Sequence, residues 1–160
     1  MELVTVPIEI PADGNLVVGQ AHFIKTVEDL AEIVVTTIPG ARFGLAFCEA
    51  SGLCLIRTEG NDPELTEAAV RAAQRIGAGH VFVLALRGAY PINLLNAVKQ
   101  CPEVCRVFCA TANPLQILVA ATDQGRGVVG VVDGSTPRGV EDEAALAQRR
   151  EFLHRIGYKR

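Results

Sequence analysis

The segment 80–86, HVFVLAL, constrains the fold more than any other part of the chain, because an unbroken apolar run follows its histidine. A strand of this composition is typical of a sheet that is covered on both faces. The other segments that predict strands are 3–10, 15–20, 43–50, 53–60, 104–112, 115–123 and 128–134. Segments with helical patterning lie between or after them, at 26–38, 63–76, 91–100 and 141–156. The sequence therefore predicts an α/β fold with helices on both faces of a sheet.

Two of the predicted connections are short enough to be hairpins. One is the Ser51-Gly52 turn between 43–50 and 53–60, and the other is the turn 124–127 between 115–123 and 128–134. Since other strands are joined through helices, we expect a mixed sheet rather than a purely parallel one. No internal repeat, low-complexity run or linker interrupts the sequence, so a single domain over 1–160 is expected.

Composition and charge exclude several classes of protein. The chain has 160 residues, is 49% hydrophobic and carries 15 Lys+Arg against 18 Asp+Glu, which excludes a disordered chain. No stretch approaches the roughly 18 apolar residues of a membrane span, and the acidic balance argues against a nucleic-acid partner. The N-terminus lacks the basic region of a signal peptide, so a cytoplasmic protein is expected. Surplus apolar surface favours a homo-oligomer.

The five cysteines favour packing over metal binding. Cys101, Cys105 and Cys109 are spaced four residues apart, which superficially suggests a metal site. However, 104–112 has the pattern of a strand, where Cys105 and Cys109 would share one face, and no CxxC pair or neighbouring histidine completes a site. We therefore predict no metal site there and buried, reduced cysteines.

A possible anion site lies where segment 15–20 leads into the first predicted helix. Residues 19–26, GQAHFIKT, mimic a Walker A loop, but Ile24 stands where the second glycine is required, so this is not a P-loop. Lys25 as a cation, Thr26 as helix N-cap and nearby His22 would still suit an anion at a helix start. Alternatively, Lys25 is solvated and His22 bonds a backbone carbonyl.

A second glycine-rich segment, GRGVVG at 125–130, matches GxGxxG but leads into a predicted strand instead of a helix. Gly127 and its neighbours would permit a tight turn or the close approach of a ligand, and Arg126 could bind phosphate or carboxylate. Asp133 could hold a metal or a sugar hydroxyl, or form an Asx turn.

Other polar residues at the ends of apolar segments are candidates for caps and turns as well as for a site. They are His80, Glu49, Ser51, Asn93 and Asn113. The hydrolase motifs GxSxG and HExxH are absent from the sequence.

Seven blocks, in order, resemble the adenosine-specific kinase family over nearly the whole chain. They are GQAHFIKTVEDL, FGLAFCEASG, RTEGND, GAGH, PINLLNAVK, FCATANP and QGRGVVGVVDG. The resemblance implies a three-layer fold, so that we expect a three-layer αβα sandwich with a mixed β-sheet. It also implies adenosine or AMP binding, a histidine that carries phosphate, ATP as donor with Mg²⁺, and an oligomer that could be a trimer or a multiple of it.

Under this resemblance the candidate residues take roles. His22 is the favoured phosphate acceptor and His80 its rival, with Lys25 and Thr26 at the phosphate and Arg126 with Gly127 as a clamp. Asp133 or Glu49 would accept a proton or hold Mg²⁺. The predicted contacts to base and ribose are Ser51, Asn93 and Asn113. The alternatives are a non-catalytic adenosine or AMP sensor and a purely structural oligomer.

Overall fold

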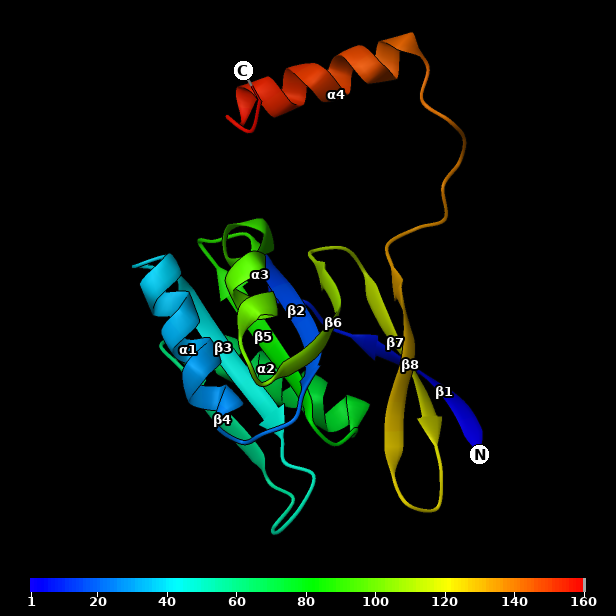
Figure 1. The fold of residues 1–160 in the computed structure, drawn as a ribbon. Helices are drawn as coiled ribbons and strands as arrows, with labels where there is room; N and C mark the ends of the chain where they lie inside the picture. Colours follow the sequence, from blue (N-terminus) through cyan, green and yellow to red (C-terminus); the bar gives the residue numbers. More distant parts are fainter. Residues whose placement is uncertain (160) are drawn as a thin grey trace.

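The computed structural model describes residues 1–159 and contains two antiparallel sheets and four helices (Figure 1). The larger sheet has the strand order β4 (Ile56–Gly60), β3 (Arg42–Cys48), β5 (Val81–Arg87), β2 (Gly14–Ala21) and β6 (Val104–Thr111). The smaller sheet has the order β1 (Glu2–Ile8), β7 (Leu115–Ala121) and β8 (Arg126–Asp133). The helices are α1 (Thr26–Thr37), α2 (Pro63–Ile76), α3 (Pro91–Gln100) and α4 (Glu143–Arg155).

The sheets differ from the mixed sheet that the sequence predicted. Every strand pair is antiparallel. Strands β2 and β3 are joined through α1, and such connections were the reason for expecting some parallel pairs. In the structure β5 lies between them and is antiparallel to both.

The layered arrangement of the prediction is confirmed. Helices α1 and α3 cover one face of the five-stranded sheet, while α2 and the three-stranded sheet share the other face (Figure 1). Strand β5 contributes to both cores: Phe82 and Leu84 pack on the α1 side, and Val81 and Val83 pack on the α2 side. The apolar run at 80–86 is therefore a central strand covered on both faces, as predicted.

Helix α2 packs unusually close to β3 at Gly44. A Cβ atom there would lie 2.1 Å from the backbone nitrogen of Thr66. Asp62 caps the same helix by accepting hydrogen bonds from the backbone N–H groups of Glu64 and Leu65. These two features fix α2, whose C-terminus forms part of the site described below.

Both predicted hairpins are present, β3–β4 and β7–β8. The first has a longer loop than the expected Ser51-Gly52 turn, because β3 ends at Cys48 and β4 begins only at Ile56. In this loop Cys54 has a positive φ of 52°.

The packing prediction holds for Cys101 and Cys109, which are buried together with Cys48. Cys105 is exposed, as is Cys54. Register shifts between β2 and β6 interrupt the alternation of β6, which is why Cys105 and Cys109 do not share a face as expected.

Helix α4 was predicted, but the segment before it was not. Residues 134–142 form neither helix nor strand and lead to α4, which stands apart from the two sheets (Figure 1). This segment contradicts the prediction that no linker interrupts the sequence. Within residues 1–159, no helix is long and apolar enough to cross a membrane.

Candidate functional site

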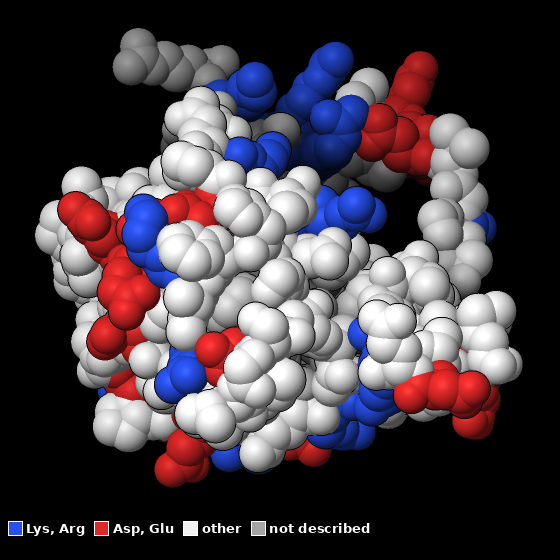
Figure 2. Space-filling view, turned by 60° about the horizontal axis from the view of Figure 1, so that its bottom comes forward, with Lys and Arg blue, Asp and Glu red and all other residues white. Residues whose placement is uncertain are grey.

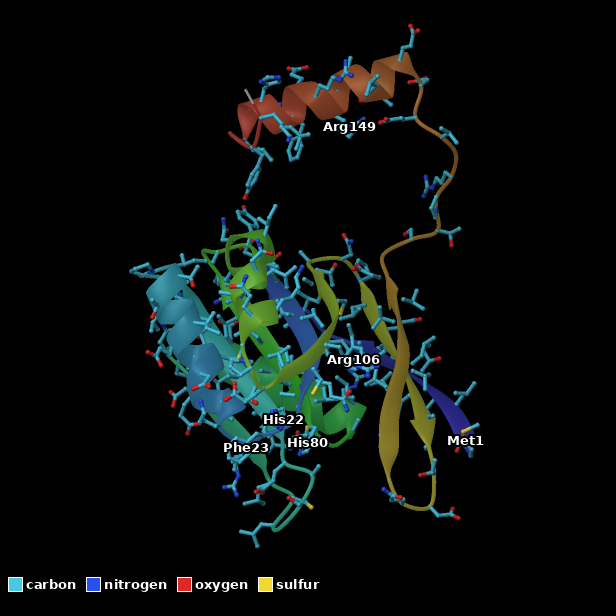
Figure 3. The ribbon with its side chains drawn as sticks, in the orientation of Figure 1. Met1, His22, Phe23, His80, Arg106 and Arg149 are labelled. Carbon is cyan, nitrogen blue, oxygen red and sulfur yellow. The ribbon has the colours of Figure 1, made fainter. Side chains whose placement is uncertain are left out.

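One end of the five-stranded sheet brings both candidate histidines together. The backbone N–H of Ala21 donates to the carbonyl of His80 at 2.9 Å, and the N–H of His80 donates to the carbonyl of Cys48 at 2.7 Å. The N–H of His22 donates to the carbonyl of Glu103 at 2.9 Å. His22 and His80 therefore occupy adjoining loops at the same end of the sheet (Figure 3).

The two imidazole rings are held differently. His80 has a positive φ of 62°, which is rare for a residue with a side chain, and its ring stacks on the buried ring of Phe47 at a centroid distance of 5.8 Å. His22 is exposed, and its ring lies 6.3 Å from that of Phe23, which is 50% exposed. His80 thus has the more fixed ring, while His22 stands beside an accessible aromatic surface.

A cavity of about 820 Å³ opens beside these loops, between the β3–β4 loop, the end of α2 and the β7–β8 hairpin. This volume lies in the range of small-molecule sites, roughly 300–1,000 Å³. Its charged lining residues are Glu49 and Arg126, and much of the remaining wall is glycine backbone, including Gly79 and Gly127. Figure 2 shows this end of the molecule, whose middle is formed mainly by uncharged side chains.

Arg126 is positioned by the C-terminus of α2. Gly77 ends that helix in the left-handed conformation, with φ 62°, and a Cβ atom there would lie 3.1 Å from Nη1 of Arg126. The same Nη1 donates to the carbonyl of Arg75 at 3.2 Å. Within residues 1–159 the guanidinium forms no ion pair, and its buried Nε has no hydrogen-bond partner. Arg126 therefore retains a charge that an anion could neutralise.

Glu49 lies across the cavity with one carboxylate oxygen engaged. Its Oε2 accepts hydrogen bonds from the backbone N–H of Leu55 at 3.2 Å and from Nη2 of Arg57 at 3.1 Å. Its Oε1 accepts no hydrogen bond from a described residue. Ser51 belongs to the same loop, is exposed, and accepts the N–H of Cys54 at its carbonyl.

The sequence predicted that Lys25 would neutralise a phosphate. In the structure Lys25 is not free to do so. Its ammonium forms ion pairs with Asp29 and, at 2.9 Å, with Glu103. The hydrogen bonds to Asp29 and Glu103 raise the pKa of Lys25. Two carboxylates already balance its charge.

Thr26 is not the N-cap of α1, because the helix begins at Thr26 itself and Lys25 occupies the cap position. Thr26 is fully buried, and its hydroxyl donates to the carbonyl of Phe23. It therefore stabilises the loop that carries His22 and offers no donor to a ligand.

Glu103 is a buried residue of this end that sequence reasoning missed. Its Oε2 accepts a hydrogen bond from Sγ of Cys101 at 2.9 Å, and its Oε1 pairs with Lys25. These two donors lower the pKa of Glu103 to about 2, and burial raises the pKa of the Cys101 thiol to about 11. The segment CPEVC gave no sign of this role, because both partners are set by the tertiary fold.

Arg106 was also missed. It is exposed on β6, opposite Gln20 of β2 and near the same end of the sheet (Figure 3). Within the described residues it forms no ion pair. Its position among apolar residues of a strand hid it from pattern analysis.

Three predicted site residues lie at the opposite end of the sheet. Oδ1 of Asp133 accepts hydrogen bonds from the Thr111 hydroxyl at 2.6 Å and the Asn113 amide at 3.1 Å, which ties β8 to the end of β6. Asn93 accepts the backbone N–H of Tyr90 at 3.0 Å and caps α3. Asp133, Asn93 and Asn113 are thus structural here and are not brought together with His22 and His80.

The fold and the cavity define an α/β protein with a site of nucleoside size, walled by glycine backbone and holding one unpaired arginine. The family model described as adenosine specific kinase matches residues 6–159, so the chain belongs to the adenosine-specific kinase family. This supports a kinase-like role.

A solved structure agrees with the fold over nearly its full length. The crystal structure of PH1918 protein from Pyrococcus horikoshii OT3 is 44% identical to this chain, with a TM-score of 0.95. The likeness covers 99% of this chain and 98% of that one. A comparison with curated proteins found no match.

Proposed function

We propose that this protein phosphorylates adenosine, with ATP as the phosphate donor and Mg²⁺ as the metal, at the end of the sheet that carries His22 and His80. The observation that supports this best is the cavity of about 820 Å³, whose lining includes Arg126, Glu49 and Gly79, the residue that precedes His80. The volume suits a nucleoside or nucleotide, and the glycine backbone permits its close approach.

His80 is the better candidate for the phosphate acceptor. The sequence favoured His22, but a transferring group must be held in one orientation, and the ring of His80 is stacked on a buried phenylalanine. A ring nitrogen of His80 would attack the γ-phosphorus as the bond to ADP breaks. A ribose hydroxyl of adenosine would then attack the same phosphorus, and the nitrogen–phosphorus bond would break to give AMP.

Glu49 and Arg126 supply the remaining chemistry of the proposal. Oε1 of Glu49, which accepts no hydrogen bond from the chain, would take the proton of the ribose hydroxyl or bind Mg²⁺. Mg²⁺, when bound, would neutralise charge on the phosphates. Arg126 would hold the phosphoryl oxygens. Asp133, the other predicted carboxylate, lies too far along the sheet to share these roles.

The test is a turnover assay of the purified protein with ATP, Mg²⁺ and a panel of nucleosides, with AMP measured by chromatography. We expect AMP from adenosine and an acid-labile phosphoprotein from γ-labelled ATP. His80→Ala should remove the label and lower turnover at least about 100-fold, in the range of a lost catalytic group. His154→Ala, on α4, is the matched histidine control and should retain both.

Loss of the label in His22→Ala but not in His80→Ala would assign the phosphate to His22 instead. Adenosine binding by calorimetry without any turnover would refute the kinase proposal and identify a sensor.

A further inference from the structure

A second arginine without an ion pair lies near the histidine end of the five-stranded sheet. Arg106, on β6, is exposed, and within residues 1–159 it forms no ion pair. It does not line the cavity. A guanidinium offers five N–H donors to phosphate or carboxylate oxygens, often two at a time. Arg106 is therefore available to an anion that extends beyond the cavity.

The strand register places Arg106 on the same side of the sheet as the cavity. Arg106 lies directly opposite Gln20 of β2, and Gln20 lies directly opposite Val81 of β5. Residues that are directly opposite on antiparallel strands have their side chains on the same face. Val81 packs in the core on the α2 side, and the cavity opens at the end of α2. Arg106 thus projects from the α2 side of the sheet.

The same register places both histidines beside this row of residues. His80 directly precedes Val81, and His22 follows Gln20 by two residues (Figure 3). Neighbouring strands lie about 4.8 Å apart, so β6 and β5 are separated by about 10 Å across the end of β2. A ligand that contacts both the Arg106 guanidinium and the His80 ring would therefore lie over the end of β2.

The two substrates of the proposed reaction differ in the charge that must be neutralised. Adenosine is neutral, whereas the ADP that leaves after transfer from ATP carries two phosphates. Lys25 is balanced by two carboxylates and Arg57 by Glu49, and Arg126 is assigned above to the phosphoryl group that is transferred. Among the described residues near the His22–His80 end, Arg106 is the cation that remains for the phosphates of ADP.

We propose that Arg106 binds the α- and β-phosphates of the donor over the end of β2, while adenosine occupies the cavity. This proposal rests on the proposed kinase function and assigns a separate place to the phosphate chain of the donor. The leaving oxygen of ADP and the attacking oxygen of adenosine occupy the same position in turn, opposite the ring nitrogen of His80. Beyond that position the β-phosphate of the donor extends toward Arg106, and the ribose of adenosine extends into the cavity.

Arg106 then acts in the first of the two transfer steps only. When the ring nitrogen of His80 attacks the γ-phosphorus, the bond from phosphorus to the bridging oxygen breaks and its electron pair stays on the β-phosphate of ADP. The Arg106 guanidinium compensates this charge. In the second step the ribose hydroxyl attacks the phosphorus, its proton passes to Glu49, and the nitrogen–phosphorus bond breaks. ADP has left by then, so Arg106 has no part in this step.

Steady-state kinetics of AMP formation test this division, with one substrate varied while the other is saturating. Arg106→Gln should lower kcat/KM for ATP about 10- to 100-fold, the range of a lost hydrogen bond to a charged group. It should leave kcat/KM for adenosine within about twofold. Arg106→Lys keeps the charge without the fork of donors and should recover part of the loss.

The matched control is Arg138→Gln. Arg138 is exposed in segment 134–142 and forms no ion pair among the described residues. It follows Asp133 and so lies away from the two histidines. This variant should keep both kinetic constants at the wild-type values.

Calorimetry with inorganic triphosphate provides a readout that does not require turnover, because this probe has the phosphate chain and no nucleoside. The wild type and Arg138→Gln should bind it equally, and Arg106→Gln should bind it at least about 10-fold more weakly. Adenosine should bind all three proteins equally. Triphosphate binding that depends on Arg106 in a protein that makes no AMP would refute the kinase proposal and retain the phosphate site.

Three results would overturn the role of Arg106, whether or not the wild type makes AMP. The first is a wild type that does not bind triphosphate, and the second is unchanged triphosphate affinity in Arg106→Gln. The third is an equal loss of affinity for triphosphate and adenosine, which would show that Arg106 supports the histidine end as a whole.

Discussion

Replacing Glu103 by Gln should destabilise the protein at neutral pH and not at low pH. The carboxylate is 4% exposed, accepts the Cys101 thiol and pairs with Lys25. Its backbone carbonyl also anchors the loop of His22. Glutamine keeps the shape and an acceptor oxygen but removes the charge, so the substitution isolates the electrostatic contribution.

The magnitude follows from the shifted pKa. The Cys101 thiol and Lys25 lower the pKa of Glu103 from 4.5 to about 2, and since each unit is worth about 1.4 kcal/mol, the upper limit is about 3 kcal/mol. The side chain of Lys25 is 55% exposed, so solvent screening reduces the expected loss to about 1–2 kcal/mol. Because the pKa is lower in the folded state, this stability is present above pH 4.5 and disappears as the pH falls toward 2.

The assay is urea unfolding followed by circular dichroism, with wild type and Glu103→Gln compared at pH 7, 4.5 and 3. The difference in unfolding free energy should shrink steadily over this series. Glu2→Gln, which changes an exposed glutamate with no ion pair among the described residues, should differ from wild type by less than about 0.5 kcal/mol throughout. A difference for Glu103→Gln that is the same at pH 7 and pH 3 would refute the assigned charge interaction.

Two further predictions concern the cysteines and the close approach of α2. Burial raises the pKa values of Cys48, Cys101 and Cys109 to about 11. A thiol reagent at pH 8 should therefore modify only Cys54 and Cys105 in the folded protein, and all five cysteines after denaturation. Rapid reaction of a buried thiol in the folded protein would contradict this packing. Gly44→Ala should lower the free energy of unfolding, measured with urea, by at least about 2 kcal/mol, because its Cβ would meet the backbone of α2. The control is Gly125→Ala, where nothing lies within 4 Å of the added Cβ. Equal effects of the two substitutions would show that the close approach of α2 to β3 does not limit stability.

The sequence predicted local structure well because local structure depends on neighbouring residues. The apolar run of β5, the Asp62–Pro63 start of α2 and the two hairpins were each visible in short windows. The order of the strands was not, since it depends on which strands pair across the whole chain. The expectation of a mixed sheet failed for this reason at β5.

The same limit explains which of the predicted site residues lie together in the structure. His22 and His80 lie at one end of the sheet and Glu49 and Arg126 line the cavity near it, whereas Asp133 lies at the other end. A residue at the end of a strand can face either edge of the sheet, and strand direction decides which.

Lys25 shows the limit most clearly, because its partner Glu103 lies far away in the sequence. The linker 134–142 is different, since its proline and glycines were a readable signal that the sequence analysis did not use.

The balance of charge at the His22–His80 end bears on how phosphate could be handled there. Lys25 is neutralised by two carboxylates, and Arg57 is paired with Glu49. Among the residues that line the cavity, this leaves Arg126 as the unpaired cation. One arginine offsets only a small part of the charge of a nucleoside triphosphate, and phosphoryl transfer depends on neutralising that charge. A kinase built on this chain would therefore need Mg²⁺ to complete the site, and the open oxygen of Glu49 is the group of the cavity wall best suited to hold it.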